Sequence, residues 1–186
     1  GVLILDLKFL QYYLLRMKKR YTANESYTHK CAKEVFKSWC DSDEWNDGSG
    51  YTRFDTSSNG CISWRSNRGQ NAWLEYPIVE TKNTNSIESN WDEIWPDERE
   101  SWNSFIPTFD DCKKHNLIPI AVVDIVLPHK GRPEYFVEIC HTNPVSDEKL
   151  AKLEKAGMRN LIEIDAEWIM SQTSIPSKIK IKRWLL

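Results

Sequence analysis

Two apolar runs joined by a turn decide the fold of this chain: Ile120-Ala-Val-Val-Asp-Ile-Val-Leu127 and Tyr135-Phe-Val-Glu-Ile-Cys140. Both runs have the length of a strand and are rich in residues that favour strands. Between them, His129-Lys-Gly-Arg-Pro133 has the glycine and proline typical of a turn. The sequence therefore predicts a β-hairpin. Each strand carries one acid inside its apolar run, Asp124 in the first and Glu138 in the second.

The segments that follow the hairpin predict a helix and then another strand. We expect a helix over residues 146–156, because Ser146 suits the N-cap, two acids follow it, and Gly157 suits the end. Leu161-Ile-Glu-Ile-Asp165 reads as a buried strand. This order of elements predicts an α/β (α+β) fold, in which a mixed β-sheet core is flanked by helices.

The N-terminal half carries helical signals before residue 41. We expect one helix over residues 3–20 and a second over residues 25–39, with Thr22 or Asn24 as the N-cap of the second. Further along, a short helix is expected over residues 109–116.

Residues 41–110 look like a variable Trp-rich insertion, because seven of the nine tryptophans lie within the first 102 residues. The polar stretch 41–59 predicts a loop. Residues 61–65 and 72–79 predict two strands joined by a turn at residues 67–70. We take residues 1–186 as a single domain that contains this insertion.

The composition is that of an ordinary globular protein, with 40% hydrophobic residues, 28% charged residues and a net charge of −2. Five cysteines without a C-x-x-C pair indicate reduced thiols and an intracellular setting, cytoplasmic or nuclear. A zinc site built from His29, Cys31 and Cys40 is the alternative. Asp6 and Lys8 interrupt the first apolar residues, so neither a signal peptide nor a membrane span is expected there.

The two acids of the hairpin indicate chemistry, because a charge inside an apolar strand is costly unless something compensates it. Neighbouring strands would bring Asp124 and Glu138 close together. Two adjacent carboxylates repel each other unless a cation lies between them, and such hard oxygen ligands suit Mg²⁺ or Mn²⁺. In the alternative interpretation, each acid pairs with a buried lysine or arginine.

These residues resemble a known family. Pro119-Ile-Ala-Val-Val-Asp124 followed by Phe136-Val-Glu-Ile-Cys140 resembles the D…(E)-x-K hairpin of the PD-(D/E)XK nucleases. Glu25-Ser-Tyr-Thr-His-Lys-Cys-Ala-Lys33 is similar to the E-S-x-x-H-x-x-x-K helix of the competence CoiA-like branch. The closing block of that branch is similar to residues 136–143, followed by Lys149 and then residues 161–165. The resemblance covers residues 22–40 and 117–170.

The resemblance implies a restriction-endonuclease-like core and a metal-dependent nuclease that acts on nucleic acid, DNA more than RNA. It implies Asp124 and Glu138 as metal ligands, with Glu25 contributing from the first helix and Mg²⁺ or Mn²⁺ as the ion. Glu25 has an equal alternative as the partner of Thr22 in a capping box. The residues expected to contact nucleic acid are His29, Lys33, Lys130, Arg132 and Asn143.

One position departs from the family pattern: Cys140 stands where the family has lysine or, in the CoiA-like branch, often glutamine. The lysine orients the attacking water and offsets the phosphate charge. Lys149 is our first choice as its replacement and therefore as a catalytic residue, with Lys33 and Lys152 as alternatives. If none of them serves, the chain is a non-catalytic nucleic-acid-binding module. A third alternative is a protein-interaction module that uses an exposed Trp-rich surface.

Two further patterns bear on function. Glu80-Thr-Lys82 is a literal E-x-K sequence that could form a rival site with Asp55, although we predict a loop at Asp55. In the C-terminal segment 178–183, lysines and isoleucines alternate, which predicts an edge strand with its lysines on one face. Those lysines would either contact phosphates or discourage aggregation through the strand edge.

Overall fold

The computed structural model describes residues 26–42, 52–56, 60–64, 72–80, 94–95, 106–129, 131–176 and 178–186, with only the backbone of 52–56 and 60–64. Its centre is a five-stranded sheet in the order β3-β4-β5-β6-β8. The strand β4 (Pro119–His129) pairs antiparallel with β3 (Trp73–Val79) on one side and with β5 (Arg132–Cys140) on the other. The predicted β4–β5 hairpin is therefore confirmed.

The strand β6 (Leu161–Asp165) pairs parallel to β5, so a crossover must connect the two. The helix α5 (Asp147–Lys155) makes this crossover; it begins after Ser146, whose side chain accepts a hydrogen bond from the Lys149 amide. Gly157 follows with a φ of 80°, which favours glycine and ends the helix. The predicted helix and strand in this region are both confirmed. The mixed sheet flanked by helices agrees with the predicted α+β class.

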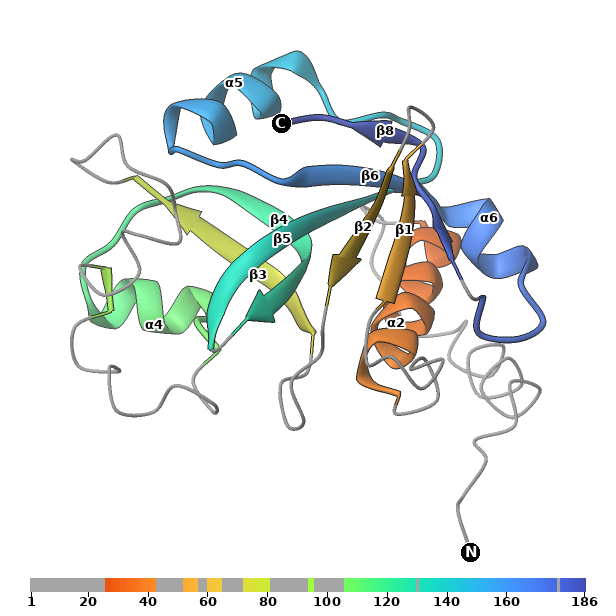
Figure 1. Ribbon diagram of the computed structural model, residues 1–186. Helices are drawn as coiled ribbons and strands as arrows, with labels where there is room; N and C mark the ends of the chain where they lie inside the picture. Colours follow the sequence, from red (N-terminus) through yellow and green to blue (C-terminus); the bar gives the residue numbers. More distant parts are fainter. Residues whose placement is uncertain are drawn as a thin grey trace, which may run out of the picture.

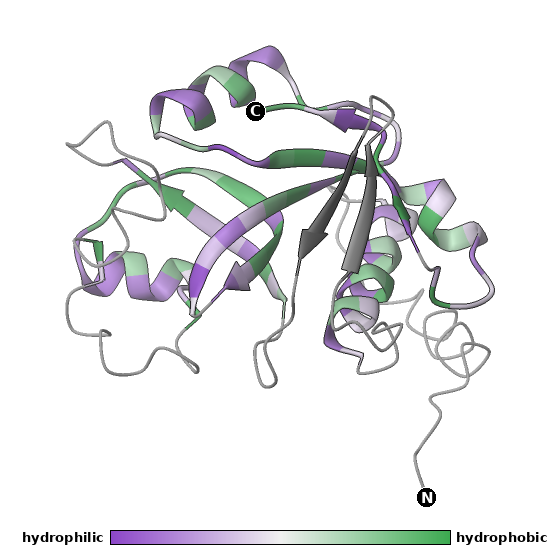
Figure 2. Cartoon of the chain, in the orientation of Figure 1, coloured by the Kyte–Doolittle hydropathy of each residue, from purple (hydrophilic) through white to green (hydrophobic). Residues whose placement is uncertain are grey.

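Helices cover both faces of this sheet (Figure 1). On one face, α2 (Tyr27–Asp41) and α6 (Ala166–Ser171) pack on the sheet through a buried cluster that includes Phe36, Trp39 and Ile169. On the other face, α4 (Phe109–Lys114) and α5 enclose a second cluster that includes Tyr76 and Leu153. Hydrophobic residues accordingly run along the central strands, while the helices also carry hydrophilic positions (Figure 2).

The start of α2 differs from the prediction. Ser26 is its N-cap, and the Ser26 hydroxyl accepts a hydrogen bond from the His29 amide, so the prediction of Thr22 or Asn24 is wrong. The expected helix over residues 3–20 and the Thr22–Glu25 capping box lie outside the described residues. Sequence patterns locate helix ends less well than helix bodies, since several neighbouring polar residues can serve as the cap.

The expected organisation of residues 41–110 is wrong in two respects. Residues 52–56 form the strand β1 (Thr52–Thr56) within the predicted loop, and β2 (Gly60–Trp64) pairs with β1 rather than with β3. The strand β3 belongs to the central sheet instead. The supposed insertion therefore supplies a strand of the central sheet. The position of β3 is determined by its pairing with β4, which is distant in sequence.

The tryptophans of this region contribute to the core. Trp39, Trp73 and Trp95 are all buried, and Trp73 packs beside Tyr76 with ring centroids 5.8 Å apart. The exposed Trp-rich surface that would mark a protein-interaction module is not found among the described tryptophans of residues 26–95.

The C-terminal segment forms two short strands rather than one. The strand β7 (Ile179–Lys180) pairs parallel with β1, which gives a three-stranded sheet in the order β2-β1-β7. The chain then changes sheet, and β8 (Arg183–Trp184) pairs antiparallel with β6. Both β7 and β8 are edge strands, as predicted for this segment. They belong to different sheets, however, so the C-terminal segment connects the two sheets. No helix in the described part of the chain is long and apolar enough to cross a bilayer.

Candidate functional site

The candidate site lies where β4 and β5 part. Their register ends with the pair Ile125–Val137, and the next residues are Asp124 on β4 and Glu138 on β5. The Asp124 carboxylate accepts a hydrogen bond of 2.8 Å from the Ile139 amide through Oδ2. The carboxylate thereby satisfies a backbone donor at the point where the strands separate.

The helix α2 directs two basic side chains toward Asp124. His29 Nε2 lies 3.1 Å from Asp124 Oδ2, and Lys33 Nζ lies 3.5 Å from Asp124 Oδ1. These residues are four positions apart, so they share one face of the helix. Burial raises the pKa of Asp124, but the hydrogen bonds from His29 and Ile139 and the nearby positive charges outweigh burial and lower it. Asp124 is therefore ionised at neutral pH.

The N-cap of α2 provides a second link to the end of β5. Ser26 Oγ lies 2.9 Å from Nδ1 of His141, the residue that follows β5. Lys33 is only 4% exposed and also pairs with Glu75 on β3. The first-helix motif and the hairpin motif of the resemblance thus meet in space.

Glu138 faces the opposite helix. Lys149 Nζ, on α5, donates to both carboxylate oxygens of Glu138 at 2.8 Å. Glu138 itself is 5% exposed. Burial, and next the negative charge of Asp124, raise the pKa of Glu138 to about 7 in spite of Lys149. Both acids line the same cleft, so the hairpin brings them to one site.

A third acid extends the row onto β6. Glu163 is the register partner of Glu138 and is fully buried. Arg183, on β8, donates to both of its carboxylate oxygens at 2.9 Å, and the Val145 amide donates to one of them at 3.0 Å. Burial raises the pKa of Glu163, but these hydrogen bonds outweigh burial and lower it.

The three acids line one cleft of about 300 Å³ between α2 and α5. Lys149 enters it from α5, with 30% of its side chain exposed, while His29 enters from α2. The other lining residues come from the end of β5 and the loop before α5. They are Ile139, Cys140, Asn143, Pro144, Val145 and Ser146.

The donor set fits Mg²⁺ or Mn²⁺ in one respect. Two adjacent carboxylates line the cleft, and Mg²⁺ in proteins commonly takes one or two carboxylates and completes its shell with waters and substrate phosphates. Burial and the negative charge of Asp124 raise the pKa of Glu138 to about 7, so a cation beside Glu138 would stabilise its ionised form. Within the described ranges, no group of three or more His, Cys, Asp or Glu residues is arranged to hold a metal ion.

That finding also bears on the zinc alternative. Cys31 and Cys40 are free, buried thiols, and His29 is directed at Asp124. The described part of the chain therefore offers no zinc site of the kind that the sequence left open.

The remaining predicted residues have different places. Glu25 and Lys130 lie outside the described residues. Asn143 lines the cleft, whereas Arg132 begins β5 at the hairpin turn, and Lys152 pairs with Glu148 on the exposed side of α5.

The acids of the rival site, Asp55 and Glu80, belong to or follow strands of different sheets. Asp55 lies on β1, not in the predicted loop, and so belongs to a different sheet from β3, which Glu80 follows. Lys82 lies outside the described residues.

Sequence reasoning missed two parts of the site. Glu163 gives the same signal as Asp124 and Glu138, an acid inside an apolar strand, and that signal could have found it. Arg183 and Glu75 gave no such signal, because their pairing depends on contacts between distant parts of the chain.

Comparison of the chain with protein-family models, with curated proteins and with solved structures gave no match.

Proposed function

We propose that this protein is a metal-dependent nuclease with a restriction-endonuclease-like core, and that it acts on phosphodiesters of nucleic acid, DNA in preference to RNA. One observation carries the proposal. Asp124 and Glu138 stand on adjacent strands of one cleft, and Lys149 reaches the same cleft from the next helix. The resemblance to the CoiA-like PD-(D/E)XK nucleases names the same two carboxylates.

Asp124 and Glu138 would hold Mg²⁺ or Mn²⁺. When bound, the ion would lower the pKa of a coordinated water and offset negative charge on the scissile phosphate. Glu25 stays a proposed third ligand. The four described cysteines are free thiols, which supports the expectation of a reducing compartment.

The protein side chains have separate tasks in this proposal. His29 and the Ile139 amide hold Asp124 in its ionised form and fix its orientation. Lys149 lies on the open side of Glu138, where it can leave the carboxylate and offset the charge of an entering phosphate. It would thereby replace the lysine that the family has at the position of Cys140.

A cleavage assay tests the proposal. Purified protein is incubated with plasmid DNA, single-stranded DNA or RNA, in Mg²⁺, Mn²⁺ or EDTA. We expect metal-dependent cleavage that Asp124→Asn abolishes and that Asp110→Asn leaves unchanged. Asp110 is a matched control, because its side chain is 90% exposed on α4. Absence of cleavage by the wild-type protein with either metal would refute the proposal.

A second candidate is a non-catalytic module that binds nucleic acid. The observation that favours it is that all three acids of the cleft contact basic side chains of the chain itself: Asp124 contacts His29 and Lys33, Glu138 contacts Lys149, and Glu163 contacts Arg183. This arrangement satisfies the acids without a metal ion. A salt-sensitive gel shift without cleavage would favour this candidate.

A further inference from the structure

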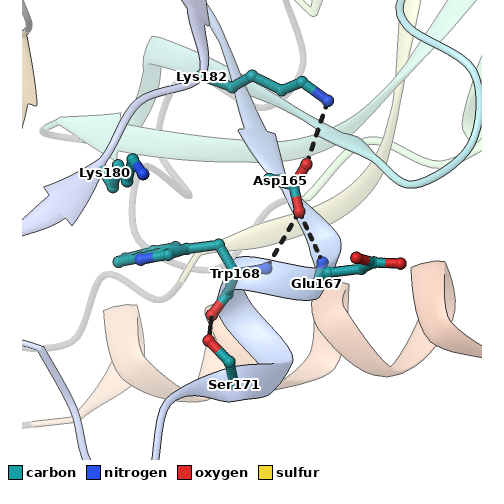
Figure 3. A pocket seen from close by; sticks show the side chains of 6 residues that line it. All are labelled: Asp165, Glu167, Trp168, Ser171, Lys180 and Lys182. Atoms are coloured by element: carbon teal, nitrogen blue, oxygen red, sulfur yellow. Dashed lines mark hydrogen bonds and ion pairs between the residues drawn. The ribbon is translucent and has the colours of Figure 1, made fainter.

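A second cleft lies at α6 (Figure 3). It has a volume of about 380 Å³, within the range of about 300–1,000 Å³ typical of small-molecule sites. Its side chains come from the end of β6, from α6 and from the C-terminal segment. They are Asp165, Glu167, Trp168, Ser171, Lys180 and Lys182.

The aromatic ring of this cleft is held in place. Trp168 packs edge-on against Trp39, with centroids 6.2 Å apart and ring planes at 83°. The Asp165 carboxylate caps α6 by accepting hydrogen bonds from the amides of Glu167 and Trp168. Trp168 nevertheless remains only half-buried and lines the cleft. A fixed, accessible indole offers a flat surface for stacking at little cost in side-chain entropy.

Charged groups of both signs line this cleft, with Lys180 on the same side as the Trp168 ring and the Glu167 side chain pointing away from it (Figure 3). Among the described residues, Lys180 and Glu167 have no ion-pair partner for their side chains, and both are exposed in the cleft. Lys182 is different, because its Nζ lies 3.1 Å from both Asp165 Oδ2 and Cys140 Sγ. Lys182 therefore has a fixed place, whereas Lys180 and Glu167 are available to a ligand.

The two clefts adjoin at Lys182. Cys140, which accepts a hydrogen bond from Lys182, also lines the first cleft with Asp124 and Glu138. The Lys182 amide donates to the carbonyl of Glu163, the third acid of that cleft, at 2.8 Å. A ligand in one cleft would consequently lie next to a ligand in the other.

We propose that this second cleft binds one nucleotide of a single-stranded nucleic acid whose neighbouring phosphate occupies the first cleft. The proposal rests on the proposed function for the identity of that strand. The base stacks on Trp168, and a backbone phosphate meets Lys180. An aromatic platform combined with a basic side chain is the usual device for binding single strands without sequence preference.

The test uses binding without cleavage. Fluorescence anisotropy measures the affinity of the full chain for a fluorescein-labelled oligothymidylate in EDTA, and for a duplex of equal length. We expect the single strand to bind more tightly than the duplex. Trp168→Leu should weaken single-strand binding about tenfold, and Trp168→Phe, which keeps a ring, should retain most of it.

A second variant tests the proposal independently of whether the Trp168 variants fold. Lys180 is exposed, so Lys180→Gln should fold normally while lowering the slope of log K against log salt by about 0.7. The matched control is Lys178→Gln, an exposed lysine two residues earlier that lines neither cleft, and its binding should be unchanged. Unchanged binding in both Trp168→Leu and Lys180→Gln would overturn the proposal, as would equal affinity for the duplex.

A competition experiment distinguishes a binding site for a strand from a binding site for a free nucleotide. A mononucleotide should displace the probe only at concentrations far above those of an unlabelled oligonucleotide, and displacement at equal concentrations would overturn the assignment to a strand. Failure of this proposal is distinguishable from failure of the nuclease. Cleavage with Mn²⁺ and normal binding by Trp168→Leu would remove the subsite alone, whereas binding defects without any cleavage would remove the nuclease alone.

Discussion

Glu138 and Glu163 are register partners on neighbouring strands, and both line one cleft, yet their surroundings differ. On the β6 side, Glu163 is closed off by two hydrogen bonds from Arg183 and one from the Val145 amide, and its pKa is lowered. On the β5 side, Glu138 has Lys149 as its partner and Asp124 as a neighbour, and its pKa is raised to about 7.

The difference distinguishes an acid whose charge Arg183 already offsets from an acid whose negative charge its surroundings disfavour. A carboxylate whose hydrogen bonds are satisfied contributes to the fold and has no need of another ligand. A buried carboxylate beside a second negative charge favours the arrival of a cation or a proton. We therefore expect substitutions on the β6 side to alter stability, and substitutions on the β5 side to alter chemistry.

The largest effect is expected from Arg183→Met. It would leave the fully buried Glu163 without its charged partner, and the free energy of unfolding should fall by about 3–4 kcal/mol in chemical denaturation. The matched variant is Lys149→Met on the other side of the cleft. At pH 6 it should lower the free energy of unfolding much less, because Glu138 can take up a proton at that pH. Equal losses in the two variants would contradict the comparison.

The next effect is a difference in pH dependence. The folded pKa of Glu138 lies above its ordinary value of 4.5, so its contribution to stability is complete below pH 4.5 and is lost as the pH rises through about 7. The free energy of unfolding of the wild type, minus that of Glu138→Gln, should fall over this window by roughly 2–3 kcal/mol.

Glu163 should behave in the opposite way. Its pKa is lowered, so its contribution is present above pH 4.5 and is lost as the pH falls through the lowered value. The difference between the wild type and Glu163→Gln should therefore grow from acidic to neutral pH. Denaturation series in EDTA measure both differences, and two curves of the same sign would argue against distinct roles.

A free-energy change of similar size is expected from Lys149→Met in catalysis. If Lys149 offsets the phosphate charge, cleavage should fall about a hundredfold, as expected for the loss of one catalytic electrostatic group, while folding and metal binding persist. Lys155→Met, at the exposed end of α5, serves as the control and should cleave normally. Full activity of Lys149→Met would exclude this role and redirect attention to Lys152 or Lys33.

The smallest effect concerns the lysines of the C-terminal segment. Replacing Lys178, Lys180 and Lys182 by Gln should flatten the salt dependence of nucleic-acid binding, if these lysines contact phosphates. Gel shifts over a salt series measure the slope. An unchanged slope would assign the lysines to protection of the strand edges.

Local signals predicted the parts of the site that depend on short-range structure. The turn at residues 129–133 brings β4 and β5 together, and the Ser146 cap and Gly157 define α5. The convergence of Asp124 and Glu138 follows from these features alone.

Partners that lie far apart in sequence could not be predicted in this way. The pairing of β3 with β4 crosses about forty residues, and alternation of residues does not specify which strand becomes the neighbour. The C-terminal segment reads as one alternating strand, yet it changes sheet after β7, which brings Arg183 to Glu163. The sequence also left open whether cations of the chain neutralise the acids, because that depends on how α2 and α5 pack.

The central proposal is that Asp124 and Glu138 bind a divalent ion. Without the ion, the ammonium group of Lys149 partly takes its place beside Glu138. A crystal of the protein soaked with Mn²⁺ tests it most directly through the anomalous signal of the metal. We expect a peak between the two carboxylates, about 2 Å from an oxygen of each, with Lys149 Nζ displaced from Glu138. An absent peak, with Lys149 still bound to both oxygens of Glu138 at saturating Mn²⁺, would contradict the account.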